Sequence, residues 1–200
     1  MRLNYRNTHE ILDFAYKFAA HYLSAQNADD DHIPLIKPEP AGVFGVSPVV
    51  CQQDNLSEEI SYATKCLETW HQRGVPWNKM AVLYCNKHQG KELAARLKTQ
   101  QIPHLLMHSK KQKSAYDPAN EVVTLSTIHS SKGLEFSRVI IMGIGALKDD
   151  EEHRQNSARL LYVGMTRAQE YLLITTSGNN EYSQDLMNIY STIVNEHFTH

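Results

Sequence analysis

Residues 122–136 read VVTLSTIHSSKGLEF, and this stretch decides the fold because an apolar run leads directly into a polar turn. The run 122–125 is short and starts with two valines, which favours a strand buried on both faces of a parallel sheet. The turn is rich in groups that can meet a phosphate, carried by Thr127, His129, Ser130, Ser131 and Lys132. A glycine at position 133 lets a ligand approach the backbone.

Taken alone, this pattern has two interpretations. A strand that runs into a phosphate-binding turn needs hydroxyls, a cation and a glycine. A strand followed by a helix with a Ser or Thr cap needs many of the same residue types. The rest of the sequence has to decide between them.

Short apolar runs recur along the chain and alternate with helical patterns. The strand-like runs are 49–51, 80–84, 122–125, 139–144 and 172–175, with 105–107 as a further candidate. The helical patterns, the first of them behind a Thr8 cap, are 8–24, 57–73, 88–99, 156–169 and 182–195. This alternation predicts an α/β fold, with a parallel sheet covered by helices on both faces. Ligands of such sheets collect at the carboxyl ends of the strands, so we expect the chemistry after Leu125, Ile144 and Thr175.

Composition limits the kinds of protein this chain can be. With 200 residues, 42% of them hydrophobic and 21% charged, it has the make-up of one globular domain, with or without a tail. The net charge of −2 excludes a broadly basic surface, so any contact with nucleic acid must be local. The segment 26–47 contains an acidic run and prolines and has the composition of a loop.

The cysteines and histidines give no sign of a disulfide framework or a metal site. The three cysteines are scattered, and the eleven histidines have no supporting pattern of carboxylates or cysteines. The acidic run 149–152 is interpreted as a solvated loop, and no metal is assigned to it. No apolar run approaches the roughly 18 residues of a membrane span, and we expect a cytoplasmic protein.

Two further blocks settle the ambiguity. Residues 158–168 read ARLLYVGMTRA, and residues 3–7 read LNYRN. Together with residues 127–136, they resemble three motifs of the UvrD-like superfamily 1 DNA helicases (the UvrD, Rep and PcrA type). The patterns are N-Y-R-[ST], T-x-H-x-x-K-G-L-E-[FW] and R-x-x-Y-V-x-x-T-R-A, in that order. Asn7 departs from the first pattern, although asparagine caps a helix equally well.

The resemblance implies that residues 1–178 are the C-terminal RecA-like domain of such a helicase. It does not extend to 179–200, which the helical pattern at 182–195 predicts to be a helical tail. It implies that Arg167 and Arg6 are catalytic and contact the γ-phosphate of ATP, as an arginine finger does. Tyr5 would stack on the adenine, Glu135 would accept hydrogen bonds from the ribose hydroxyls, and Gly133 would also belong to the ATP site. Single-stranded DNA would be contacted from this chain by Thr127, His129, Ser130 and Lys132.

The sequence also lacks parts of such a motor. No G-x-x-x-x-G-K-[ST] occurs, since Gly90-Lys91 is followed by Glu92. We therefore expect ATP with Mg²⁺ to bind only together with an N-terminal RecA-like domain that carries the P-loop, encoded before Met1 in a longer protein. This chain alone is expected to be inactive. The large helical subdomain usual in the family is missing, and only 108–121, with a basic loop at 109–114, takes its place.

Two other functions remain as alternatives. The chain could be a non-catalytic binding module on a helicase-derived fold, although the intact Arg6, Glu135 and Arg167 favour the helicase. A hydrolase with a Cys-His pair is a third interpretation, and it lacks any nucleophile motif. The resemblance favours a helicase half with no membrane contact, moving 3′ to 5′ on its strand.

Overall fold

The fold is given by a computed structural model that describes residues 7–23 and 43–198. The helices are α1 (His9–Tyr22), α2 (Leu56–Gln72), α3 (Lys87–Thr99), α4 (Lys110–Ser114), α5 (Arg154–Met165) and α6 (Glu181–Phe198). The strands are β1 (Val49–Gln52), β2 (Met80–Tyr84), β3 (His104–Leu106), β4 (Val123–Thr127), β5 (Phe136–Met142) and β6 (Ala168–Thr176). Three short 3₁₀ turns are η1 (Trp77–Lys79), η2 (His129–Ser131) and η3 (Ile144–Ala146).

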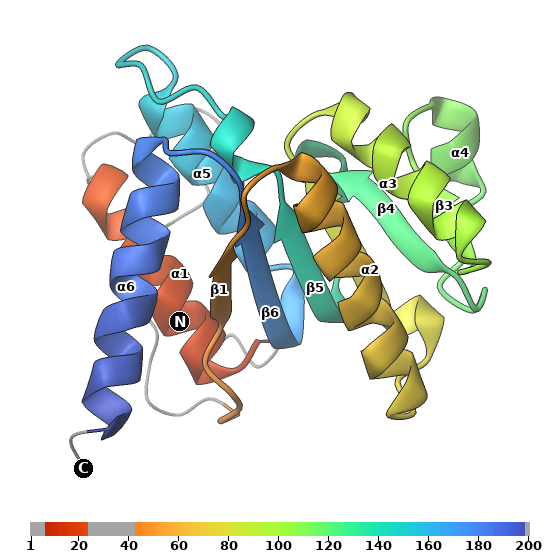
Figure 1. The fold of residues 1–200 in the computed structure, drawn as a ribbon, viewed down its shortest axis with the longest axis horizontal. Helices are drawn as coiled ribbons and strands as arrows, with labels where there is room; N and C mark the ends of the chain where they lie inside the picture. The colour runs from red at the N-terminus through yellow and green to blue at the C-terminus, as the bar shows by residue number, and fades with distance from the viewer. Residues whose placement is uncertain (1–6, 24–42, 199–200) are drawn as a thin grey trace.

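The strands form one six-stranded sheet in the order β1-β6-β5-β2-β4-β3, and every pairing is parallel. Helices α1, α5 and α6 share one apolar core with the sheet, whereas α2 and α3 pack on the other face (Figure 1). Strand β2 is fully buried, as expected for a central strand between two helical layers. The predicted α/β parallel sheet with helices on both faces is confirmed.

The sequence placed most elements correctly but misjudged several ends. The strand predicted at 139–144 is β5, which ends at Met142, and the predicted basic loop 109–114 contains α4. The pattern at 156–169 predicted a helix, but α5 ends at Met165 and β6 begins at Ala168. The reason is that Ala168 pairs with Phe136 of β5, so the sheet ladder takes residues that a helical pattern also fits. Thr8 precedes α1 as predicted, yet its side chain makes no capping hydrogen bond.

The predicted loop 26–47 lies partly outside the described residues, which resume at residue 43. There Val43 forms a parallel bridge with Thr8, and the backbone N–H of His9 donates to the Val43 carbonyl at 2.8 Å. The chain from 44 to 48 has no regular structure before β1 begins. The end of the predicted loop is therefore fastened to the start of α1.

The link from β4 to β5 is unusually short for parallel strands. Only the eight residues 128–135 run from the carboxyl end of β4 to the amino end of β5, with β2 lying between the two strands. Connections of this type normally need about a dozen residues or more, usually including a helix. Ile128 is buried against Gly164 of α5, where an added Cβ would lie 3.0 Å from the Ile128 side chain. The absence of a side chain at 164 lets this crossing segment lie flat against the domain.

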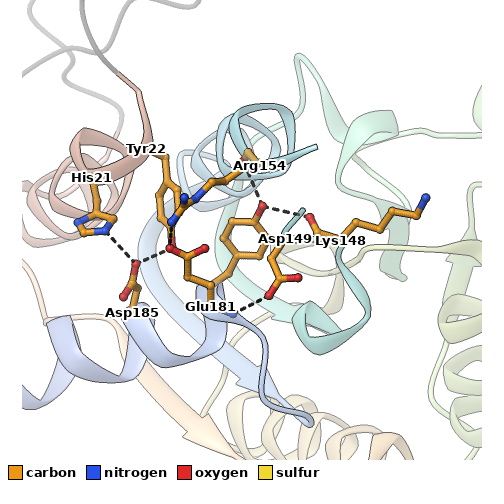
Figure 2. A network of polar contacts seen from close by, with 8 residues as sticks. His21, Tyr22, Lys148, Asp149, Arg154, Glu181 and Asp185 are labelled. Carbon is orange, nitrogen blue, oxygen red and sulfur yellow. Dashed lines mark hydrogen bonds and ion pairs between the residues drawn. The ribbon is translucent and has the colours of Figure 1, made fainter. Parts of the chain in front are cut away.

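Helix α6 packs on the domain through buried side chains. Tyr182 and Leu186 are both fully buried in the core shared with α1 and α5. The Tyr182 hydroxyl lies 3.1 Å from each of two backbone carbonyls, those of Lys148 and Arg154 (Figure 2). Residues beyond 180 are thus held by both apolar and polar contacts.

Charged side chains at the surface add a second link between α6 and its neighbours. Figure 2 shows the Tyr22 hydroxyl donating to the carboxylate of Asp185, and Arg154 paired with Glu181. The guanidinium of Arg154 also lies 5.6 Å from the centre of the Tyr22 ring. Burial and the Asp185 carboxylate together raise the pKa of Tyr22, so its hydroxyl remains a donor.

A buried carboxylate closes the carboxyl edge of the sheet on the side of β5 and β6. Glu59 of α2 is fully buried and accepts hydrogen bonds from the Gly143 N–H at 2.9 Å and the Thr175 hydroxyl at 2.8 Å, and also from the Ser177 hydroxyl. Gln89 completes this network by donating to the Gly143 carbonyl at 3.0 Å. The loops after Ile144 and Thr175, where we expected chemistry, are therefore filled by structural contacts.

We predict that Glu59→Ala lowers the free energy of unfolding by about 3 kcal/mol, because a buried N–H and two hydroxyls lose their acceptor. The neighbouring Glu58 is exposed and serves as the matched control, and Glu58→Ala should change stability by about 0.5 kcal/mol or less. Urea denaturation followed by circular dichroism measures both. Equal losses in the two variants would contradict the structural role of Glu59.

We also predict that Leu186→Ala costs about 2 to 4 kcal/mol, since it leaves a cavity between α6 and the core. Asn188, two residues further along α6, is exposed, so Asn188→Ala should be close to neutral. Thermal and urea unfolding of both variants test this. A neutral Leu186→Ala would mean that α6 is not docked as described.

Candidate functional site

The polar turn after β4 is tightly organised by its own hydroxyl groups. Thr127 is the last residue of β4, and its hydroxyl accepts from the backbone N–H of Ser130 at 3.2 Å. Ser131 is buried, and its hydroxyl donates to the Ile128 carbonyl at 2.7 Å. These bonds fold residues 129–131 into a 3₁₀ turn, so no capped α-helix follows β4. His129 is left exposed at the carboxyl edge of the sheet.

Lys132 and Gly133 begin the return toward β5, and both are exposed. Gly133 has φ +87°, a conformation that residues with a side chain rarely adopt. The space around it is open, since an added Cβ would meet no atom within 4 Å. The backbone angle alone therefore accounts for a glycine here, and the open space leaves the backbone accessible to a ligand.

Arg167 lies in the turn between α5 and β6, and its side chain is half-buried. Its Nε donates to the Val163 carbonyl at 3.0 Å, and Nη1 donates to the Leu134 carbonyl at 3.2 Å. The first bond ties the guanidinium to α5 and the second ties it to the crossing segment 128–135. Arg167 is thus a braced cation and not a flexible one on a helix surface.

Glu135 lies beside this arginine at the amino edge of the sheet. It precedes the first residue of β5, and its carboxylate accepts a hydrogen bond from Gln169 at 3.3 Å. The backbone N–H of Phe136 donates to the Arg167 carbonyl at 2.9 Å, which joins the starts of β5 and β6. Glu135 and Arg167 both precede their strands, so these two candidate residues lie at the amino edge and not in the loops after Leu125, Ile144 and Thr175, where we expected the chemistry.

The chain before α1 is fastened at the same edge. Asn7 is buried, and its side-chain amide donates to the Thr166 carbonyl at 3.0 Å and to the Ala168 carbonyl. The N–H of Thr8 donates to the Gln169 carbonyl at 3.0 Å. Asn7 therefore bonds to the turn that carries Arg167 instead of capping α1, which corrects our interpretation of that position. Tyr5 and Arg6 lie outside the described residues.

The candidate residues thus fall into two groups on opposite edges of the sheet. Glu135 and Arg167 lie at the amino ends of β5 and β6, beside Asn7. Thr127, His129 and Ser130 lie at the carboxyl end of β4. The crossing segment 128–135 joins the two groups, and Lys132 and Gly133 lie within it.

Sequence reasoning missed the network around Glu59. One signal was available, because Glu59 falls on the same helical stripe as the buried Ala63 and Leu67. A carboxylate on an apolar stripe indicates a buried polar partner. The partners themselves come from residues more than 80 positions away, so they were not visible in the local pattern.

Two of the three cysteines, Cys66 and Cys85, are poorly suited to nucleophilic chemistry. Burial, with a smaller contribution from Glu59, raises the pKa of the Cys85 thiol, and burial also raises that of Cys66. A thiol with a raised pKa is a poor source of the reactive thiolate. The structure therefore adds nothing in favour of the Cys-His hydrolase alternative.

One group of side chains has the composition of a metal site. His21, Glu181 and Asp185 bring ligand atoms within 4.8 Å of one another. Both carboxylates already have protein partners, Arg154 for Glu181 and the Tyr22 hydroxyl for Asp185. We interpret this group as the structural link of α6 and assign no metal to it. Within the described ranges, no helix has the length and apolarity that crossing a membrane would require.

Relatives of known identity match about a quarter of the chain. PcrA, an ATP-dependent DNA helicase of Staphylococcus aureus strain Mu50, is 48% identical over 62 residues, which cover 26% of this chain and 8% of that protein. PcrA of Staphylococcus epidermidis is 45% identical over 64 residues, covering 28% of this chain and 9% of its own length. The chain therefore spans less than a tenth of these curated relatives.

The fold also has a close counterpart among solved structures. The C-terminal domain of a possible DNA helicase from Lactobacillus plantarum WCFS1 superimposes with a TM-score of 0.63 at 18% identity, covering 90% of this chain and 92% of that one. The family model of the UvrD-like helicase C-terminal domain matches residues 1–112 and 108–179. With three ordered motifs, this fold and a family match over most of its length, the chain belongs to the UvrD-like helicase C-terminal domain family.

Proposed function

We propose that this chain is the C-terminal half of an ATP-dependent helicase or translocase that acts on single-stranded DNA. It would dock on an N-terminal RecA-like domain carrying the P-loop, and ATP with Mg²⁺ would bind between the two. The single observation that carries this proposal is the position of Arg167. A braced guanidinium, a carboxylate at Glu135 and the anchored Asn7 lie together at one edge of the sheet.

These residues fit the phosphate and ribose groups of a nucleotide. Arg167 presents a planar fork suited to a γ-phosphate, and its bonds to Val163 and Leu134 hold that fork in place before any ligand arrives. A preorganised cation stabilises charge that builds on the transferred phosphoryl group without reorganising during the reaction. By the family resemblance, Arg6 would act as a second such cation and Tyr5 would stack on the adenine. Both lie outside the described residues, and Asn7, the first described residue, is bonded at this edge.

We assign the single strand to the opposite edge, at Thr127, His129, Ser130 and Lys132. The exposed ring of His129 and the ammonium of Lys132 suit a base and a phosphate respectively. No residue of this chain is assigned to Mg²⁺, which the P-loop domain would hold. The open space at Gly133 would let ATP, bound between the two domains, approach the backbone there.

The crossing segment 128–135 supplies a physical route between the two edges. Arg167 holds the Leu134 carbonyl, so a displacement of the turn that carries Arg167 when the two domains close would also shift the crossing segment. Leu134 belongs to the same short segment as His129, so the strand-binding turn would shift with it. Repeated binding and hydrolysis would then move the single strand stepwise across the domain. In this mechanism Arg167 of this chain contacts the phosphate and segment 128–135 transmits the movement to the strand-binding turn, while the P-loop partner binds the nucleotide.

We predict that Arg167→Ala lowers the rate of ATP hydrolysis stimulated by single-stranded DNA roughly a thousandfold, because the cation facing the phosphoryl group is lost. The assay uses this chain assembled with its P-loop domain. Arg167→Lys should rescue only partly, since an ammonium lacks the rigid fork. The exposed Arg96 of α3 provides the control, and Arg96→Ala should keep the full rate.

The same assay separates the proposal from the binding-module alternative. The chain without a P-loop partner should show no hydrolysis above background. Urea denaturation of Arg167→Ala checks that the domain stays folded without the bonds to Val163 and Leu134. If a folded Arg167→Ala assembly hydrolyses ATP at the normal rate, the catalytic proposal fails and the non-catalytic binding module takes its place.

A further inference from the structure

Three elements begin at neighbouring positions on one edge of the sheet, and two of them, α3 and α4, carry surface lysines. Strands β2, β4 and β3 are adjacent in the sheet, and α3, η2 and α4 follow their carboxyl ends. Parallel strands point the same way, so these three starts lie at the same edge. With a spacing of about 4.8 Å between strands, the edge is about 10 Å wide. We call the exposed lysines on it the basic edge, which consists of Lys87, Lys91, Lys110, Lys111 and Lys113.

A buried contact holds the two lysine-bearing helices together. Tyr84, the last residue of β2, is fully buried, and its hydroxyl lies 2.6 Å from Nε2 of His108, just before α4. Gly90 of α3 makes room for this ring, because an added Cβ there would lie 2.2 Å from the Tyr84 ring. The contact fixes the approach to α4 beside the first turn of α3, and Figure 1 shows both helices on the side of β3 and β4.

Helix α4 is built to stand out from the sheet, although it is only five residues long. Ser109 and Gln112 form a reciprocal capping box, in which the Gln112 side chain accepts from the N–H groups of His108 and Ser109. All three lysines of α4 are exposed, and the helix contributes no buried residue to the core. Packing against the core therefore does not explain why α4 carries three lysines.

The charges on this edge act together. The pKa of His108 is lowered first by burial and then by the positive charges of Lys87 and Lys91, so those lysines lie within electrostatic reach of His108. Within the described residues, none of the five lysines of the basic edge forms an ion pair, while the neighbouring Glu92 pairs with His88. A chain with a net charge of −2 thus concentrates unneutralised cations at one edge.

The basic edge continues directly from the residues assigned to the single strand. Thr127 of β4 is paired in register with Tyr84 of β2, and Leu125 is paired with Leu106 of β3. Single-stranded DNA lying on Thr127 and His129 would therefore reach the starts of α3 and α4 within the width of one or two β-strands. Closely spaced ammonium groups along such a path suit a phosphate backbone.

We propose that the basic edge is a second binding surface for the phosphate backbone of single-stranded DNA, which lengthens the contact made by Thr127, His129 and Lys132. This inference rests on the proposed function. It gives the short 108–121 segment a binding role in a chain without a large inserted subdomain. Binding through ammonium groups alone should be independent of base sequence and strongly weakened by salt.

The test measures the affinity of this chain for a fluorescein-labelled 20-nucleotide oligothymidylate by anisotropy over a series of KCl concentrations. The basic-edge variant carries Lys87→Gln, Lys91→Gln, Lys110→Gln and Lys111→Gln. The control variant carries four substitutions of other exposed cations, Lys65→Gln, Arg73→Gln, Lys79→Gln and Lys98→Gln. Both variants have the same net charge, so any difference between them reports position.

We expect the basic-edge variant to bind at least tenfold more weakly than the control variant at 50 mM KCl. The slope of its plot of log affinity against log salt concentration should be less negative by about 2 to 3, because each phosphate contact to a single strand contributes about −0.7 to that slope. Affinities that agree within twofold, with equal slopes, would overturn the proposal. Circular dichroism melts confirm that both variants are folded.

A third variant, Thr127→Val with His129→Ala, separates this inference from the proposed function. If it weakens binding while the basic-edge variant does not, the basic edge is refuted and the strand assignment at β4 stands. If the chain shows no binding even at 20 mM KCl, both fail. If a duplex of the same length binds more tightly than the single strand and loses that affinity in the basic-edge variant, the single-strand assignment is overturned.

Discussion

The connection between β4 and β5 is the constraint on which the rest of this domain depends. Eight residues must cross from one edge of the sheet to the other while β2 lies between the strands. Only the short 3₁₀ turn η2 fits into this link and an α-helix does not, so the segment lies flat against α5. This requires Gly164 beneath Ile128 and a positive φ at Gly133. The short segment 128–135 also couples the turn after β4 directly to the start of β5.

Arg167 gains its position from that constraint. The Leu134 carbonyl that it binds belongs to the crossing segment, and the Val163 carbonyl belongs to the last turns of α5. Its own carbonyl accepts from Phe136, so the backbone and the side chain of one residue join α5, β5 and the crossing segment. The side-chain amide of Asn7 bonds to the turn that carries Arg167. Because Arg167 is bonded on several sides, its side chain is rigid and can transmit small displacements between α5, β5 and the crossing segment.

The carboxyl edge divides into two parts with different uses. Above β5 and β6, Glu59 and Gln89 occupy the loops with buried hydrogen bonds, which leaves that part closed. Above β2, β4 and β3, the five lysines of the basic edge are exposed, and the buried Tyr84 bonds to the partly buried His108. Exposure and charge therefore favour binding on one part of the edge, and satisfied burial favours stability on the other.

The sequence by itself determined the elements and the chemical character of the candidate site. Strands such as Met80–Tyr84 were predicted because an uninterrupted apolar run has few alternatives. The motif residues were recognised because they resemble the motifs of the UvrD-like helicases in order and spacing. Only the tertiary structure decided where these residues meet. The local sequence pattern places residue 167 in a helix. In the folded domain Ala168 pairs with Phe136 and begins β6, so Arg167 lies at the amino edge of the sheet. The partners of Glu59, Asn7 and Tyr84 likewise come from distant segments, and no local pattern encodes a contact that exists only after the sheet has formed.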